Sequence, residues 1–419
     1  MTPHTTTEHV RLYCGDVNDW REVIEPGTVK LSHVDGPFNM RKADWDCLTG
    51  ARVGFPERLT TLAQRYPDIP AERIDALGGY IAALSVLDPR GADLAAWYAP
   101  VLAEVSAACA LSASCYVWNT DAGEALLRPV MQALGWTWRG CVRWSKPIDK
   151  VMRTVDFALI RRWLDITESC GFYQREEWAP SASAGAEIGY AAGADDRNIA
   201  RAFLASEWRE AGLRRGEADK AMGTNGMAGH YFGTSQWSLP TWDAYQALAA
   251  YADANGTPRA RPYLVLPEHW PSDSDALRTS YDHLREEYDH LREEYEASRP
   301  PFTAPLGVSN VWRANAVPGR QRLKRADGET HPCQKPLDFA ERILRASSTP
   351  GDLVVDWFAG TSRLAVANVQ RLDRAERRDV VSIEADARWL DAVAPALSAE
   401  ASLASIGTED APSLFGGAL

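Results

Sequence analysis

Apolar positions alternate between short β-rich runs and longer stretches with helical spacing, first from Val10 to about Pro180 and again from Pro336 onward. This alternation is typical of an α/β unit with a mostly parallel sheet. In the first region it predicts strands at Val29–Val34, Ser114–Asn119, Trp138–Trp144 and Phe157–Arg162 and helices at Leu94–Leu111 and Ala122–Leu134. In the second it predicts strands at Asp352–Asp356 and Val380–Glu384 and helices at Leu337–Ala346, Ser362–Leu372 and Arg388–Leu397.

The middle of the chain has a different pattern. Residues 179–196, rich in Ala, Ser and Gly, predict a linker, and Arg197–Asp253 has helical spacing. Residues 281–294 repeat the heptad YDHLREE twice, with apolar positions three and four apart that continue to Tyr295. This helix either docks on its own chain or pairs with a second copy in a homodimer. We therefore divide the chain into an α/β half at 1–178, an inserted helical region at 179–310 with a heptad helix at 281–295, a second α/β half at 311–397 and a tail at 398–419.

Composition limits the protein class without naming a function. The 419 residues are 45% hydrophobic and 24% charged, as in ordinary globular proteins of more than one compact unit. A net charge of -12 argues against a surface that tracks nucleic acid everywhere, but it allows a local basic groove. Seven cysteines without a CxxC pair predict reduced thiols and no metal site. The N-terminus has no signal-like pattern and no long apolar run occurs, so we expect a cytoplasmic protein without membrane contact.

A candidate cofactor site lies in the second α/β half. The strand that ends at Asp356 continues into a tight turn at Gly360, where the missing Cβ lets the backbone approach a ligand. The next strand ends at Glu384, whose carboxylate can accept hydrogen bonds from both hydroxyls of a ribose. Upstream, His331–Pro336 forms a proline-bracketed loop in which Lys335 can meet a carboxylate. These features predict a site for a nucleotide-like cofactor.

The stretch HPCQKPLDFAERILRASSTPGDLVVDWFAG resembles the HP-x-QKP and D-x-F-x-G elements of the DNA N-4/N-6 (amino) methyltransferases. The resemblance implies a Rossmann-like methyltransferase sheet, interrupted here by the helical insert, with S-adenosylmethionine as the cofactor. Tyr13-Cys14-Gly15-Asp16 resembles the opening GD element, which the family places near the adenine of the cofactor. The residues assigned to cofactor binding are Asp16, His331, Gln334, Lys335, Asp356, Phe358, Gly360 and Glu384.

Asp35-Gly36-Pro37-Phe38 follows a predicted strand and resembles the catalytic D-P-P-Y/F element of the same family. Methyl transfer to a conjugated amine needs acceptors that hold the amine, because such an amine is a poor nucleophile. The Asp35 carboxylate and the Gly36 carbonyl can accept from it, and the Phe38 ring can stack on an extruded base. In the family, Asp in the first place favours adenine, and a catalytic element that precedes the cofactor element is the β arrangement. Further substrate contacts are assigned to Asn39 and to Trp144 and Lys146, which resemble the family's W-x-K strand end.

The insert is a candidate reader of the DNA target. Its segment from Phe203 to Ala250 has helix-turn-helix spacing and is similar to phage-repressor modules. Such a module places Arg214 and Arg215 near phosphates, and it places Asn225, His230, Tyr231, Ser235 and Gln236 near base edges. The alternative is a plain helical packing domain with Trp208, Phe232 and Trp237 as its core.

The chain departs from the family pattern at two places. Gly36 stands where the family has Pro, and Thr361-Ser362-Arg363 stands where Ser-Gly-Thr is usual. A Cβ at Ser362 can crowd the methionine end of the cofactor, and Arg363 is unexpected beside a sulfonium, so we expect weakened cofactor binding before lost chemistry.

Three functions stay open. The first is methylation of adenine N6 in double-stranded DNA after base flipping, the second is an inactive DNA-binding relative, and the third is methylation of cytosine N4. Similarity to phage-encoded methylases indicates a bacterial or phage setting. The sequence does not specify the target site or whether the enzyme acts with a restriction endonuclease in a restriction-modification system.

Overall fold

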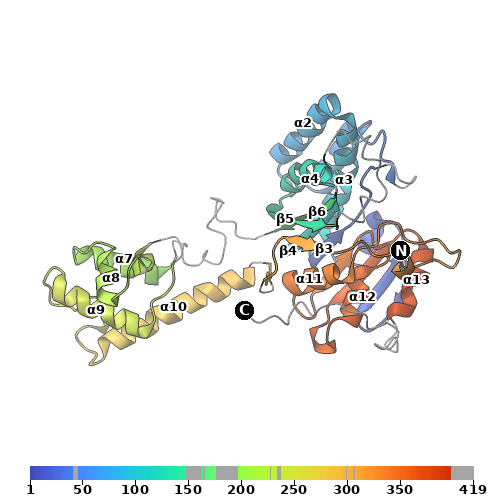
Figure 1. The fold of residues 1–419 in the computed structure, drawn as a ribbon. Coiled ribbons are helices and arrows are strands. Elements are labelled where there is room, and N and C mark those ends of the chain that lie inside the picture. The colour runs from blue at the N-terminus through green and yellow to red at the C-terminus, as the bar shows by residue number, and fades with distance from the viewer. Residues whose placement is uncertain are drawn as a thin grey trace. The chain divides into compact units, whose positions relative to one another are not determined.

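The computed structural model describes residues 1–40, 46–147, 163, 166–175, 197–226, 228–233, 237–298, 300–304 and 307–397. The chain divides into two compact units, of which the first joins Met1–Glu176 to Pro300–Leu419 and the second is Glu177–Arg299. Figure 1 shows the elements of both units. The predicted strand at 157–162, the linker at 179–196 and the tail at 398–419 lie outside the described residues.

A twisted sheet with strand order β1-β2-β9-β8-β3-β4-β6-β5-β7 runs through the described part of the first unit. The strands are β1 Thr2–Thr6, β2 Val10–Cys14, β3 Val29–Val34, β4 Cys109–Asn119, β5 Thr137–Ser145, β6 Thr167–Gln174, β7 Val311–Arg313, β8 Leu353–Asp356 and β9 Asp379–Glu384. The run from β2 through β9, β8 and β3 to β4 is parallel. β6 is antiparallel to both of its neighbours. The carboxyl ends of the parallel strands therefore share one edge, where doubly wound sheets bind their ligands.

Helices cover both faces of this sheet, as Figure 1 shows. The helices are α1 Phe55–Arg65, α2 Ala71–Leu87, α3 Pro89–Ala108, α4 Asp121–Ala133, α11 Leu337–Ser347, α12 Arg363–Gln370 and α13 Ala387–Leu397, with short 3₁₀ turns η1 Val17–Glu22, η6 Gly319–Gln321 and η7 Arg374–Glu376. Side chains alternate between the two faces of a strand, so Val355 packs into the core with α3 and α4 while Val354 packs into the core with α11, α12 and α13. A parallel sheet that is buried on both faces explains the apolar runs of β8 and β9.

Most element positions follow the sequence prediction. β3 has the predicted bounds, and β8, β9, α11 and α13 begin and end within a residue of theirs. β4 begins at Cys109, five residues before its predicted start, and α3 begins at Pro89 instead of Leu94. The strand Thr167–Gln174 was not predicted. Residues 300–310, which we had assigned to the insert, belong to the first unit.

The second unit is helical. Its elements are α7 Ile199–Glu210, α8 Glu217–Met222, η4 Ala228–Phe232, α9 Trp242–Asn255, η5 Pro267–His269 and α10 Ala276–Ser298. Trp208, Phe232 and Trp237 are buried together, and the rings of Trp208 and Phe232 stack at 4.6 Å. The residues that the packing alternative assigned to a core therefore form one. Among the described helices of the whole chain, none combines the length and apolar character needed to cross a membrane.

The heptad stripe of α10 packs on its own unit. Tyr281 and Leu284 belong to the same core as Trp208, and the Tyr288 ring meets that of Trp237 at 4.9 Å. At the far end of the described stripe Leu291 is also buried. The contacts from Tyr281 to Tyr288 therefore favour the docking interpretation of the heptads.

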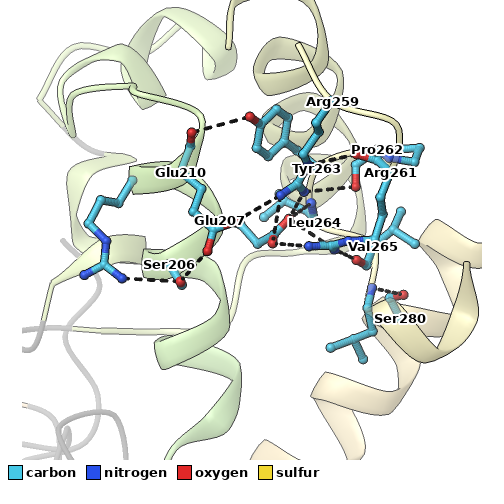
Figure 2. A network of polar contacts seen from close by, with 12 residues as sticks. Ser206, Glu207, Glu210, Arg259, Arg261, Pro262, Tyr263, Leu264, Val265 and Ser280 are labelled. Carbon is cyan, nitrogen blue, oxygen red and sulfur yellow. Dashed lines mark hydrogen bonds and ion pairs between the residues drawn. The ribbon is translucent and has the colours of Figure 1, made fainter. Parts of the chain in front are cut away.

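A buried carboxylate ties α7 to the loop that follows α9 (Figure 2). Glu207 is 4% exposed and accepts hydrogen bonds from Arg259, from Arg261 at 2.7 Å and from the backbone N–H of Leu264 at 2.9 Å. Burial alone raises the pKa of Glu207, but the two arginines outweigh it and hold the pKa below its usual value. This network holds α7 and the loop after α9 together within the second unit.

Candidate active site

A cavity of about 840 Å³ lies in the first unit at the carboxyl ends of β3, β8 and β9. Strand register explains why distant sequence segments meet there, because His33 pairs with Asp356 across β3 and β8 and Asp356 pairs with Ser382 across β8 and β9. The predicted site residues that line it are Asp35, Gly36, Pro37, Phe38, His331, Gln334, Lys335, Asp356, Phe358, Gly360 and Glu384. The volume lies within the range of roughly 300–1,000 Å³ common for small-molecule sites.

Lys335 pairs with two carboxylates on the side of the cavity that carries Asp35. Its ammonium lies 2.8 Å from each carboxylate oxygen of Asp35 and 3.3 Å from Glu168 on β6. Burial alone lowers the pKa of Lys335, but these two carboxylates outweigh it and raise the pKa above its usual value. The ammonium also lies 5.3 Å from the centre of the Phe38 ring and 5.0 Å from that of Trp118. Lys335 therefore stays charged and fixes the Asp35 carboxylate at the cavity wall.

Glu168 continues this ion network to a second lysine. Its other oxygen lies 2.5 Å from the Lys146 ammonium, which stands over the Trp144 ring at 4.6 Å. Burial raises the pKa of Glu168, but the charges of Lys335 and Lys146 outweigh that effect and lower it. The charges thus alternate in sign from Asp35 to Lys146.

The loop that carries Asp35 is held by side chains outside the motif. Asp46 accepts hydrogen bonds from the backbone N–H groups of Phe38 at 2.7 Å and Met40 at 3.0 Å. The Tyr98 hydroxyl donates to the Pro37 carbonyl at 3.1 Å. A Cβ on Gly36 would lie 2.7 Å from that hydroxyl, so only glycine fits there without a shift. The conformation of residues 35–38 is therefore set by packing and hydrogen bonds rather than by a second proline.

The turn after β8 packs closely under His331. Gly360 has φ +49, and a Cβ on it would lie 2.8 Å from the His331 imidazole. That ring meets Trp389 edge-on at 4.7 Å, and burial lowers its pKa to about 4, so it is neutral at pH 7. Gly360 therefore leaves room for both His331 and the cavity.

Ser362 also has a left-handed backbone, with φ 42, and its buried hydroxyl has no hydrogen-bond partner among the described residues. Unlike Thr361 and Arg363, Ser362 does not line the cavity. We had expected its Cβ to crowd the methionine end of the cofactor, and its position outside the cavity wall argues against that. The cost of this substitution is backbone strain.

Two more carboxylates line the cavity, the buried Asp356 and the half-buried Glu384. Glu384 accepts from the N–H groups of Gly360 at 2.7 Å and Asp386 at 3.0 Å, and burial raises its pKa. Burial also raises the pKa of Asp356, although His33 at 2.9 Å opposes this. Glu384 borders a second cavity of about 370 Å³, which Asp16 and Asn18 also line. Phe358, Glu384 and Ala385 line both cavities.

A family model described as DNA methylase, for the N6/N4 methyltransferases, matches residues 29–409. The chain belongs to this DNA methylase family. The methyl donor of the family is S-adenosylmethionine, the cofactor that the sequence motifs implied. Within the matched range lie both the loop at Asp35 and the turn at Gly360.

One curated relative of this DNA methylase matches a short part of the chain. The Type II methyltransferase M.HinfI of Haemophilus influenzae is 32% identical over 84 residues, which is 20% of this chain and 22% of that protein. The matched part thus spans about a fifth of that curated relative.

Solved structures similar to the DNA methylase include the PvuII DNA methyltransferase (cytosine-N4-specific), with 12% identity, a TM-score of 0.44 and coverage of 94% of this chain and 88% of the other. The M1.HpyAVI–SAM complex has 10% identity, a TM-score of 0.38 and coverage of 93% and 99%. The S-adenosyl-L-methionine complex of a DNA modification methylase from Thermus thermophilus has 11% identity, a TM-score of 0.38 and coverage of 93% and 96%.

Several predicted substrate residues of the DNA methylase lie away from the large cavity. The Asn39 side chain is 3% exposed and bonds the backbone of Leu48 and Arg90, so it supports the loop from behind. Trp144 is buried, and its indole N–H donates to the Ala314 carbonyl at 2.9 Å. Lys146 reaches the site only through Glu168. Arg214, Arg215 and Asn225 are exposed in the second unit, where His230 and Tyr231 are half-buried, while Ser235 and Gln236 lie outside the described residues.

Sequence reasoning missed three residues that shape the site, namely Asp46, Tyr98 and Glu168. Asp46 and Tyr98 act on the backbone of the loop from 8 and 61 residues away, and no motif marks them. Glu168 was missed because no strand was predicted at Thr167–Gln174. The run from Thr167 to Gln174 was the one signal that could have found it, through its β-rich composition.

Proposed function

We propose that this DNA methylase transfers a methyl group from S-adenosylmethionine to N6 of adenine in double-stranded DNA. The observation that carries the proposal is the meeting of two motifs in one cavity, with Asp35 and Phe38 on one wall and Gly360 and Glu384 on another. Adenine is favoured over cytosine because Asp35 occupies the first position of the catalytic motif.

The cavity walls fit this cofactor. Each Glu384 oxygen accepts one backbone N–H and keeps lone pairs for the hydroxyls of a ribose. Asp16 lines the smaller cavity beyond Glu384, where an adenine ring has room. Gly360 leaves space beside the His331 imidazole, which a Cβ at this position would occupy. When bound, S-adenosylmethionine supplies an electrophilic methyl group on its sulfonium.

The chain's own residues hold and orient the amine that is methylated. Lys335 fixes the Asp35 carboxylate through both oxygens, and each oxygen keeps a lone pair for an amine N–H, because among the described residues Lys335 is the one donor to this carboxylate. The Gly36 carbonyl accepts the second N–H, which directs the nitrogen lone pair toward the methyl group. The Phe38 ring stacks on the base after it leaves the duplex.

The second unit is the candidate reader of the DNA target. Arg214 and Arg215 are exposed at the turn between α7 and α8 and are available to phosphates. Asn225 is exposed in the loop that follows α8. The buried core around Trp208 provides the rigid support that such a reader needs. A double variant, Arg214→Ala with Arg215→Ala, is expected to weaken DNA binding and reduce its salt dependence.

The test is incubation of the purified chain with unmodified DNA and labelled cofactor, followed by modification-sensitive sequencing and mass spectrometry of the nucleosides. N6-methyladenine at one sequence is the expected product. The Asp35→Ala variant should lose methylation and keep cofactor binding. The Asp35→Asn variant should give the same result and disturbs the surroundings of Lys335 less. Full activity in both variants would contradict the role of Asp35 as the acceptor for the target amine.

Two alternatives are separated by the same experiment. N4-methylcytosine among the digested nucleosides would replace adenine by cytosine as the target. DNA binding without heat on titration of S-adenosylmethionine would favour a non-catalytic relative, the interpretation that the departures at Gly36 and Ser362 had raised.

A further inference from the structure

One charged side chain at the cavity has no role in the chemistry described so far. Arg363, the first residue of α12, lines the cavity and has its Nε atom buried without a hydrogen-bond partner among the described residues. Burial, and to a lesser extent repulsion from Arg371, lowers its pKa to about 10, so it stays charged at pH 7. Asp338 attracts it but is engaged with Arg371 at 3.7 Å.

The other cations on the described cavity wall are paired. Lys335 contacts Asp35 and Glu168, and Arg325 contacts Asp327 and Asp386. Arg388 is 61% exposed and lies 2.7 Å from Asp386. Arg363 differs from all three, because no described carboxylate lies within ion-pair distance of it. Arg363 is half-buried, and its Nε atom is shielded from solvent. A guanidinium that is partly buried without a partner is costly, so its retention indicates an anion that arrives with a ligand.

We propose that Arg363 binds the α-carboxylate of S-adenosylmethionine, an inference that rests on the function proposed above. The carboxylate is the anionic group of that cofactor, and a guanidinium binds carboxylates through two parallel hydrogen bonds. The cavity wall at this point continues through Gly360 and Thr361 into α12, whose first turn adds backbone N–H groups and no side-chain cap.

This role resolves the conflict between a cationic residue and a cationic cofactor. The sulfonium carries its charge near the reacting methyl group, where Asp35 and Asp356 supply negative charge. The carboxylate lies at the end of the methionine chain, several bonds from the sulfur. Arg363 therefore attracts one end of the cofactor, while the carboxylates on the β3 and β8 side offset the charge of the other.

The test compares S-adenosylmethionine with its decarboxylated form, which keeps the sulfonium and lacks the carboxylate, by isothermal titration. Wild type should bind S-adenosylmethionine about 10- to 100-fold more tightly than the decarboxylated form, the loss typical of a charge-assisted hydrogen bond. Arg363→Met should bind the two within about threefold, and Arg363→Lys should keep part of the discrimination. Arg388→Met is the matched control, and it should keep the wild-type ratio because Arg388 is already paired.

Each outcome decides whether Arg363 alone or the whole cofactor site is wrongly assigned. An unchanged ratio in Arg363→Met, or tighter S-adenosylmethionine binding than in wild type, would overturn the role of Arg363 and leave the methyltransferase proposal intact. Failure of wild type to bind either compound would overturn both. Thermal unfolding of every variant establishes that it is folded, and Arg363→Lys keeps the comparison available if Arg363→Met does not fold.

Discussion

Removal of the charge of Glu168 should damage catalysis more than folding. Glu168 lies 3.3 Å from the Lys335 ammonium and 2.5 Å from that of Lys146. At an effective dielectric constant of about 20, unit charges at the first distance attract by about 5 kcal/mol, which is an upper bound. The Glu168 side chain is 21% exposed, so solvent weakens this attraction. We therefore expect Glu168→Gln to lose about 1.5–3 kcal/mol of transition-state stabilisation.

The loss should appear in kcat/KM. Without Glu168, the Lys335 charge is balanced by Asp35 alone. The ammonium then binds the Asp35 oxygens more strongly, and these oxygens accept less well from the target amine. A cost of about 1.5–3 kcal/mol corresponds to a reduction of about 10- to 150-fold. The assay is steady-state transfer of labelled methyl groups to DNA, with the Kd of S-adenosylmethionine measured separately and expected to change little.

Asp121→Asn is the matched control for that experiment. Asp121 accepts hydrogen bonds from Thr167 at 2.9 Å and from Ser169, the two neighbours of Glu168 on β6, without touching Lys335. Its loss perturbs the same strand and should leave kcat/KM within about threefold of wild type, because exposed pairs contribute little. Equal losses in the two variants, or a Glu168→Gln enzyme within about twofold of wild type, would refute the charge-balance argument.

Two further predictions concern stability and the cofactor turn. Glu207→Gln should lower the free energy of unfolding by about 2–4 kcal/mol in chemical denaturation, whereas Glu210→Gln, which removes a 55% exposed partner of Arg259, should cost less than about 1 kcal/mol. Since the pKa of Glu207 is lowered on folding from 4.5, its contribution is complete above that pH and disappears as the pH falls through the folded value. Gly360→Ala should weaken S-adenosylmethionine binding in titration, while Gly328→Ala, with φ +85 and open space around it, should show only the strain cost of about 1–2 kcal/mol in thermal unfolding.

The sequence predicted the cofactor half well because its information is local. The strand at Leu353–Asp356, the turn at Gly360 and the acidic end of the next strand at Glu384 follow one another within 32 residues. The spacing of apolar residues and the residues of the turn are sufficient to predict such a unit. The resemblance to known motifs then connected this unit with the loop at Asp35, which lies more than 300 residues away and shares its cavity.

The residues that support the catalytic loop could not be predicted in the same way. Tyr98 looks like any aromatic residue on an amphipathic helix, and its hydroxyl reaches Pro37 only because α3 packs beside β3 and β4. Glu168 lies in a strand that pairs antiparallel between β4 and β5. Such contacts depend on tertiary packing, on which a single sequence carries no periodic signal.

The two departures from the family pattern have different physical consequences. At Gly36 a Cβ would lie 2.7 Å from the Tyr98 hydroxyl, which donates to the Pro37 carbonyl, and Asp46 accepts from the backbone N–H of Phe38. The rigidity lost with proline is thus supplied by other side chains, which argues against Gly36 as a trace of lost activity. At Ser362 the left-handed backbone and the unpartnered hydroxyl are uncompensated among the described residues, yet they lie behind the cavity wall. Any weakness of this protein should therefore appear in stability rather than in the orientation of the target amine.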